Sequence, residues 1–155
     1  METSATIGLG RAWILLCVAL ALHVLDEALT GFLDVYNPTV LALRQHWPGF
    51  PMPVFEFRDW LAGLIVGILL LFLLSFFFYS GARWIRPLAY VFSALMILNG
   101  LGHTLGTVLG RTVESVRFAR PMPGFYSSPF LIAASVYVLW QLLATRRALP
   151  GTRRG

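Results

Sequence analysis

Apolar residues dominate four long stretches of the chain, and polar residues gather in the connections between them. Each stretch approaches the roughly 20 helical residues that are needed to cross a hydrocarbon core of about 30 Å. The pattern therefore predicts an all-α fold, a four-helix transmembrane bundle that forms one integral-membrane domain over residues 1–155. The predicted spans cover residues 12–33, 60–80, 87–109 and 125–145, and residues 150–155 are predicted to form a disordered tail.

The first connection, residues 34–58, is long for so small a bundle. We expect the first helix to end near Asp34, ahead of Asn37 and Pro38, because proline disfavours helical backbone in the residue before it. A short amphipathic turn is expected at residues 39–46. Aromatic side chains in this connection suit the membrane–water interface, so it is either an interfacial anchor or a lid over a cavity.

The composition excludes an ordinary soluble domain. Of the residues, 57% are hydrophobic and only 12% are charged, against about 25% charged in typical soluble domains. Arginines are concentrated at the N-terminus, in the second connection and at the C-terminus, which predicts cytoplasmic termini in a multipass protein of the cytoplasmic (inner) membrane. Flanking arginines beside anionic headgroups account for the formal charge of +5, so the predicted partner is the lipid bilayer and not nucleic acid. A homo-oligomer is compatible with the sequence.

The N-terminal stretch has a second interpretation, a cleavable signal peptide with residues 19–21 (Ala-Leu-Ala) as its cleavage site. Cleavage would discard the helix that carries the polar residues described next. An uncleaved first span is favoured because it fits the length rule. Cys17, the only cysteine, allows no internal disulfide.

Ionisable residues interrupt the first apolar stretch. His23, Asp26 and Glu27 share one face of a helix, because residues three and four apart are neighbours there, and Thr30 continues the stripe. An ionisable group near the centre of a bilayer costs roughly 2.5–3.5 kcal/mol on insertion scales unless it finds a partner. We therefore expect these side chains to face the interior of the bundle.

The third stretch carries a second polar cluster that contains Asn99 and His103. With a rise of about 1.5 Å per residue, His23 and Asn99 both lie roughly 17–18 Å from the cytoplasmic edge, and Glu27 and His103 roughly 23–24 Å. The two clusters therefore lie at matching depths in the outer half of the bilayer, which predicts a single site.

Two further features flank this cluster. Glycines at positions 102, 106 and 110 repeat every four residues and predict close packing against another helix. In the third connection, Arg117 and Arg120 lie on the same side as the buried carboxylates and are expected to reach toward them. The connection ends in a rigid turn rich in proline and glycine, followed by Tyr126.

The motifs resemble those of HXXEE-domain proteins, small multipass bacterial membrane proteins with a second histidine and a Tyr-x-Pro-Gly turn. The corresponding residues here are 23–27 (His-Val-Leu-Asp-Glu), His103 and 121–124 (Pro-Met-Pro-Gly), in the same order along essentially the whole chain. Two positions depart from the family pattern: Asp26 stands for the first Glu, and Pro121 stands for the Tyr. The family has no settled biochemical function, so the resemblance implies a site but not a reaction.

The first hypothesis for this site is a metal centre. His23, Glu27 and His103 would supply two imidazoles and a carboxylate, a ligand set that suits zinc or iron with an open position for water or substrate. Asp26 would be a second carboxylate ligand or a base, and Asn99 would orient a histidine. A metal ion in the outer half of the membrane would activate water against a lipophilic substrate.

The second hypothesis is acid–base catalysis without a metal, such as hydrolysis, isomerisation or hydration of an apolar molecule. Asp26, Glu27 and His103 would be the catalytic groups. The candidates for binding the substrate are Asn99, Thr30, Arg117, Arg120 and Tyr126.

The remaining alternatives are a proton-linked transporter, a ligand-binding membrane protein and a polar network that only locks two helices together. An enzyme is favoured over a transporter, because four helices without inverted repeats offer little material for alternating access.

Overall fold

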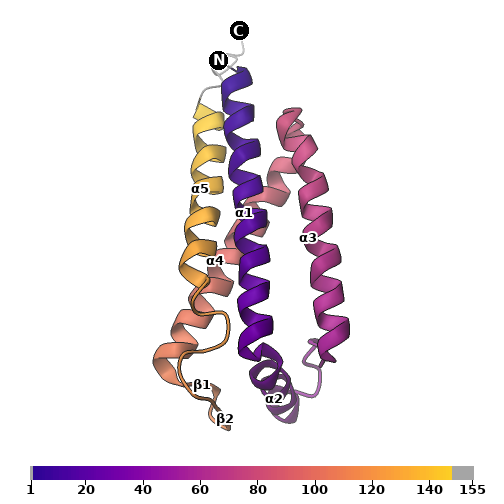
Figure 1. Ribbon diagram of the computed structural model, residues 1–155, viewed down its shortest axis with the longest axis vertical. Helices are drawn as coiled ribbons and strands as arrows, with labels where there is room; N and C mark the ends of the chain where they lie inside the picture. Colours follow the sequence, from indigo (N-terminus) through magenta and orange to yellow (C-terminus); the bar gives the residue numbers. More distant parts are fainter. Residues whose placement is uncertain (1, 148–155) are drawn as a thin grey trace.

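The computed structural model describes residues 2–147, with the side chains of residues 6–145. Four long helices form an elongated bundle, and the start of α1 lies at the same end as the end of α5 (Figure 1). All four are long and apolar enough to cross a membrane, which confirms the predicted number of spans. The predicted tail, 150–155, lies outside the described residues. The long helices are α1 (Glu2–Thr30), α3 (Phe57–Tyr79), α4 (Arg86–Leu109) and α5 (Ser128–Arg147).

The four helices are not equally buried. α1 contacts α3 and α5, and α4 packs mainly on α5. Half of the most apolar window of α1 is buried, against 11% in α3, so α1 is the interior helix and α3 forms an outer wall of exposed leucine, isoleucine and phenylalanine. Pro87 and Pro129 lie in the first turns of α4 and α5, where a missing N–H breaks no helical hydrogen bond.

A fifth helix, α2 (Phe32–His46), lies across the end of the bundle (Figure 1). The predictions that the first helix extends to Asp34 and that only residues 39–46 form a turn are therefore wrong. α1 ends at Thr30 because Gly31 adopts a left-handed conformation with φ 79°, which a residue without Cβ tolerates. The next helix then begins at once.

Helix α2 continues through Pro38, which was expected to lie beyond a helix end. An interior proline costs roughly 3 kcal/mol, because it removes a hydrogen bond and crowds the preceding turn. The neighbouring Asn37 supplies tertiary hydrogen bonds: its Nδ2 donates to the Phe55 carbonyl at 2.8 Å, and the Phe55 N–H donates to its Oδ1 at 3.0 Å. These bonds join α2 to the connection that follows it, and such contacts are not visible in the local sequence.

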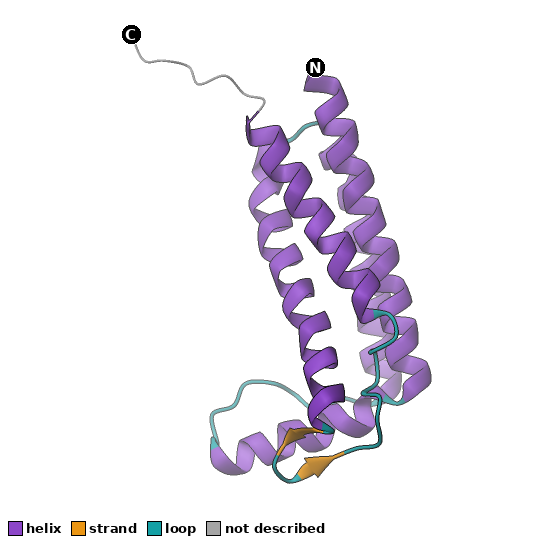
Figure 2. Ribbon diagram, turned by 90° about the vertical axis from the view of Figure 1, so that its left-hand side faces the viewer, coloured by secondary structure: helices purple, strands orange, loops and turns teal. Residues whose placement is uncertain are grey.

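Short irregular elements complete the fold. A single 3₁₀ turn, η1 (Arg83–Ile85), precedes α4. After α4, strands β1 (Arg111–Val113) and β2 (Val116–Arg117) form an antiparallel hairpin at the same end of the bundle as α2 (Figure 2). A hydrogen bond between the hydroxyls of Thr39 and Thr112 joins the hairpin to α2. The all-α prediction therefore holds for the bundle, and this hairpin is the addition.

The glycines of α4 do not form the predicted helix–helix seam at 102, 106 and 110. The glycine that α5 approaches most closely is Gly100, where an added Cβ would lie 2.7 Å from Cγ1 of Ile132. Gly106 and Gly110 instead face the connection after the hairpin, and an added Cβ on Gly102 would meet nothing within 4 Å. The four-residue repeat therefore marks a face covered by a loop and, at Gly102, an open groove.

Candidate metal centre

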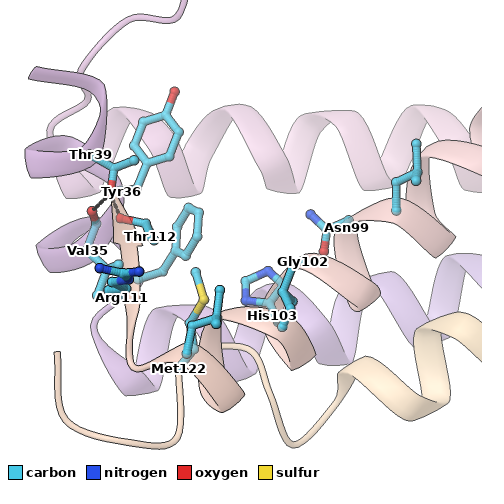
Figure 3. Close-up of a pocket in the computed structure, with 14 residues that line it drawn as sticks. Val35, Tyr36, Thr39, Asn99, Gly102, His103, Arg111, Thr112 and Met122 are labelled. Atoms are coloured by element: carbon cyan, nitrogen blue, oxygen red, sulfur yellow. Dashed lines mark hydrogen bonds between the residues drawn. The ribbon is translucent and has the colours of Figure 1, made fainter. Parts of the chain in front are cut away.

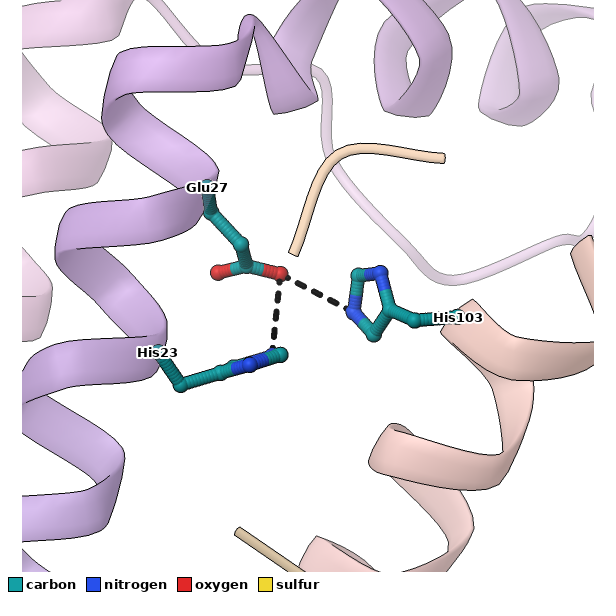
Figure 4. A group of neighbouring side chains, drawn as sticks. All are labelled: His23, Glu27 and His103. Atoms are coloured by element: carbon teal, nitrogen blue, oxygen red, sulfur yellow. Dashed lines mark ion pairs between the residues drawn. The ribbon is translucent and has the colours of Figure 1, made fainter. Parts of the chain in front are cut away.

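Three buried side chains from two helices meet near the α2 end of the bundle. His23 and Glu27 lie one turn apart on α1, and His103 reaches them from α4 (Figure 4). Their exposed fractions are only 1%, 5% and 4%. Nε2 of His103 lies 3.1 Å from Oε1 of Glu27, and Nε2 of His23 lies 3.5 Å from the same oxygen. The structure thus brings together the three residues that the sequence suggested as metal ligands.

The outer nitrogen of His23 is held by a serine. Nδ1 of His23 lies 2.8 Å from Oγ of Ser127. The same hydroxyl donates to Oδ2 of Asp26 at 2.8 Å, with the Gly124 carbonyl at 3.2 Å as a further acceptor. Because the hydroxyl has one proton and both of these neighbours only accept, the Nδ1–H of His23 must donate to Ser127. In a neutral ring, Nε2 then carries a lone pair.

The outer nitrogen of His103 is fixed in the same way. Its Nδ1 lies 2.5 Å from the backbone carbonyl of Pro123, and a carbonyl oxygen can only accept. Nδ1 of His103 therefore carries the proton, and its Nε2 lone pair faces Glu27. Both histidines thus present Nε2 to one carboxylate oxygen.

A cation would stabilise this arrangement of two Nε2 atoms around one carboxylate oxygen. Two lone pairs and a carboxylate repel one another unless a metal ion or a proton lies between them. Nε2 of His23 is buried and has no hydrogen-bond partner among the described residues. In a tetrahedral zinc site with bonds of 2.0–2.1 Å, ligand atoms are separated by about 3.3–3.4 Å. The two nitrogen–oxygen separations, 3.1 and 3.5 Å, lie on either side of that value, and the ligand atoms of the three residues all lie within 4.8 Å of one another.

A turn between the hairpin and α5 closes the site. Gly124 has φ 81°, and an added Cβ would lie 2.9 Å from Cε1 and Nδ1 of His103 and 3.0 Å from Cγ of Glu27. Only glycine combines this backbone conformation with so close an approach. Sequence reasoning identified the turn at residues 121–124 through the family motif, but it missed the contacts of this turn and of Ser127 with the two histidines.

The other sequence candidates on α1 lie beside the cluster. Asp26 is half-buried and accepts hydrogen bonds from N–H and Oγ of Ser127, at 2.9 and 2.8 Å, so it anchors the start of α5 and does not join the three ligands. Thr30 is exposed, and its hydroxyl donates to the backbone carbonyl of Asp26 at 2.6 Å.

The remaining candidates are more distant. Asn99 is exposed one turn from His103 and lines a neighbouring cavity. Tyr126 is 70% exposed, and its ring packs edge-on against Phe125. Arg117 and Arg120 do not reach the carboxylates, because the hairpin directs this segment away from the site; both are exposed and line a different cavity.

A cavity of about 340 Å³ adjoins His103 (Figure 3). α4 forms one side of it and α2 forms another, with Phe32 lying 5.7 Å from the His103 ring between centroids. The long first connection therefore supplies a wall of this cavity. Most of its lining is apolar. The residues with polar groups are Tyr36, Thr39, Asn99, His103, Arg111 and Thr112.

Comparison with known proteins found no matching family model, no matching curated protein and no matching solved structure. The resemblance to HXXEE-domain proteins stays a prediction.

Proposed function

We propose that this chain is a metal-dependent membrane enzyme that acts on a lipophilic substrate, with zinc or iron held by His23, Glu27 and His103. One observation carries the proposal. Each imidazole donates its Nδ1–H to an outer acceptor and turns Nε2 toward the same carboxylate oxygen. Metal-binding histidines almost always have such an outer acceptor, which fixes the tautomer and the orientation of the ring.

The ligand set favours catalysis over a purely structural metal. Structural zinc sites are closed by four protein ligands, whereas catalytic sites use three and keep a position open. A zinc or iron ion here would supply Lewis-acid activation of a water molecule or a carbonyl oxygen. The apolar cavity beside His103 favours a substrate that enters from the hydrocarbon.

A second candidate is acid–base catalysis without a metal. The 3.1 Å separation between Nε2 of His103 and Oε1 of Glu27 also suits a direct hydrogen bond from a protonated imidazole to the carboxylate. In either case we propose that the protein lies in the cytoplasmic membrane with both termini on the cytoplasmic side, as its arginine distribution favours.

Elemental analysis of protein purified in a mild detergent tests the proposal. We expect one zinc or iron ion per chain in the wild type and loss of most of it in Glu27→Gln and His103→Ala. His46→Ala is the matched control, because His46 lies outside the cluster and its Nδ1 contacts the Ala42 carbonyl at 2.9 Å. Equal metal content in all four proteins would refute the metal centre and leave the acid–base candidate. Size-exclusion profiles verify that each variant is folded.

A further inference from the structure

Three arginines surround one cavity at the α2 end of the bundle. Arg111, Arg117 and Arg120 line a space of about 450 Å³ together with the end of α4. Arg111 lies opposite Arg117 in the register of the hairpin. An added Cβ on Gly110 would lie 3.0 Å from Nε of Arg120, so that side chain crosses the end of α4. The fold therefore brings together three arginines from β1, from β2 and from the segment after β2.

No acid in the described part of the chain forms an ion pair with these arginines. The ion pairs found there involve only His23, Glu27 and His103, and none involves an arginine. Like charges directly opposite each other in an antiparallel pair are destabilising. An arrangement that concentrates positive charge without a partner favours an anionic ligand, and guanidinium groups bind phosphate in bidentate fashion.

The arginine cavity adjoins the apolar cavity beside His103. Leu109 and Arg111 line both of them, and Figure 3 shows Arg111 in the lining of the apolar cavity. The apolar cavity follows α4 from Leu98 to Leu109, which corresponds to about 16 Å of helix. That length exceeds the roughly 15 Å hydrocarbon depth of one leaflet. Its volume of about 340 Å³ lies in the range of small-molecule sites.

We propose that Arg111, Arg117 and Arg120 bind the phosphate group of a membrane lipid whose hydrocarbon chain lies in the apolar cavity beside His103. The charge selects the headgroup, and the exposed leucines with Gly102 on α4 accommodate the chain. The identification of this lipid as the substrate of the metal centre rests on the proposed function, but its binding does not.

Binding of a lysophosphatidic acid with a fluorescent chain, measured in phosphatidylcholine nanodiscs, tests the headgroup. We expect the double variant Arg117→Gln, Arg120→Gln to bind it at least about tenfold more weakly, as the loss of one or more charge-assisted hydrogen bonds implies. The control double variant Arg44→Gln, Arg58→Gln removes the same two charges outside the cavity and is expected to bind like the wild type. Equal losses in the two double variants would overturn the site.

Two other probes separate the possible sources of the phosphate. The monoacylglycerol with the same chain should bind at least about tenfold more weakly than the phosphate lipid, since it lacks the anion. Equal binding of this neutral lipid would overturn the role of the arginines. Glycerol 3-phosphate should compete only at much higher concentration, and competition as effective as that of the lipid would assign the site to a soluble phosphate ester instead.

Gly102→Leu tests the apolar cavity. The new side chain has open space and is expected to fill the cavity without disturbing the fold, so lipid binding should fall by about tenfold or more. Gly63→Leu is the matched control, because an added Cβ there also meets nothing within 4 Å and Gly63 does not line the cavity. Unchanged binding in Gly102→Leu would overturn the placement of the chain.

The same assay separates this proposal from the metal centre. Lipid binding should persist in Glu27→Gln, and the metal content of the arginine variants should match the wild type. A protein that binds no metal but discriminates the lipids as expected would refute only the proposed function. A protein that binds metal but shows no preference for the phosphate lipid would refute only the lipid site.

Discussion

The two halves of the bundle are held together by different interactions. In the half where α1 begins, Trp13, Phe78 and Ile85 are almost completely buried, and Trp13 stacks on Phe78 with 4.4 Å between ring centroids. In the half near α2, His23 and His103 occupy the interior, and each is oriented by a hydrogen bond from its outer nitrogen.

The difference follows from the membrane as a solvent. Lipid tails are as apolar as leucine, so helices gain little from burying apolar area against each other, and association depends on close packing and on polar contacts. The first half uses close packing, and the second uses polar contacts. Stability and metal binding should therefore respond to substitutions in different halves.

The largest effect on stability is expected in the apolar half. Trp13→Ala should lower the free energy of unfolding by about 3 kcal/mol, because it leaves a cavity, and it also removes the 2.9 Å hydrogen bond to the Leu71 carbonyl. Metal content per folded chain should not change. Unfolding in mixed micelles measures the first quantity and elemental analysis the second. Trp140→Ala, at a position that is 61% exposed, is the control. Loss of metal from folded Trp13→Ala protein would contradict the expectation that the two halves control stability and metal binding separately.

Gly124→Ala should affect both quantities. The positive φ of this residue implies strain of about 1–3 kcal/mol for alanine. The new Cβ would also lie 2.9 Å from the His103 ring, so the imidazole must move. We expect metal affinity to fall by about 10–100-fold, the range seen when the outer partners of metal ligands are changed.

Gly81→Ala is the matched control for this substitution. Gly81 has φ 75° in the turn between α3 and α4, at the end of the bundle opposite α2 and the metal centre (Figure 1). Gly81→Ala should introduce similar backbone strain but leave the metal affinity unchanged. Metal affinity is measured by titration in competition with a chelator. If Gly81→Ala lowered metal affinity as much as Gly124→Ala, the effect would be general destabilisation and not displacement of His103.

The smallest effect is expected for Ser127→Ala. It removes the acceptor for Nδ1–H of His23 and should weaken metal binding by about tenfold, with a loss of about 1 kcal/mol in stability. Ser135→Ala is the control, because its hydroxyl donates to the Leu131 carbonyl at 2.7 Å within α5, away from the site. The prediction fails if the two variants bind metal equally well.

Much of the bundle could be predicted from the sequence. Span lengths depend only on the number of consecutive apolar residues, so four membrane-length helices followed directly. The meeting of Glu27 with His103 followed from a fixed helical rise and from the cost of leaving ionisable groups in lipid. The length of an apolar stretch, the helical rise and the cost of an ionisable group in lipid depend little on tertiary contacts.

Most of the failed predictions lie in connections, and the glycine seam predicted for α4 also failed. The break at Gly31 depends on its left-handed backbone, and Asn37, beside Pro38 in α2, is held by hydrogen bonds to Phe55. The positions of Arg117 and Arg120 depend on a hairpin whose two strands contain only five residues. Such short segments carry no periodicity, so their conformation is decided by what they contact.

The sequence by itself determined which residues were able to bind a cation and that they lie at matching levels along two helices. Only the tertiary structure decided that their ring nitrogens converge, because this depends on Pro123 and Ser127, which follow His23 by about 100 residues. Helical periodicity selects the face on which a side chain lies, but the direction of its lone pair is set by hydrogen-bond partners that the fold brings from elsewhere.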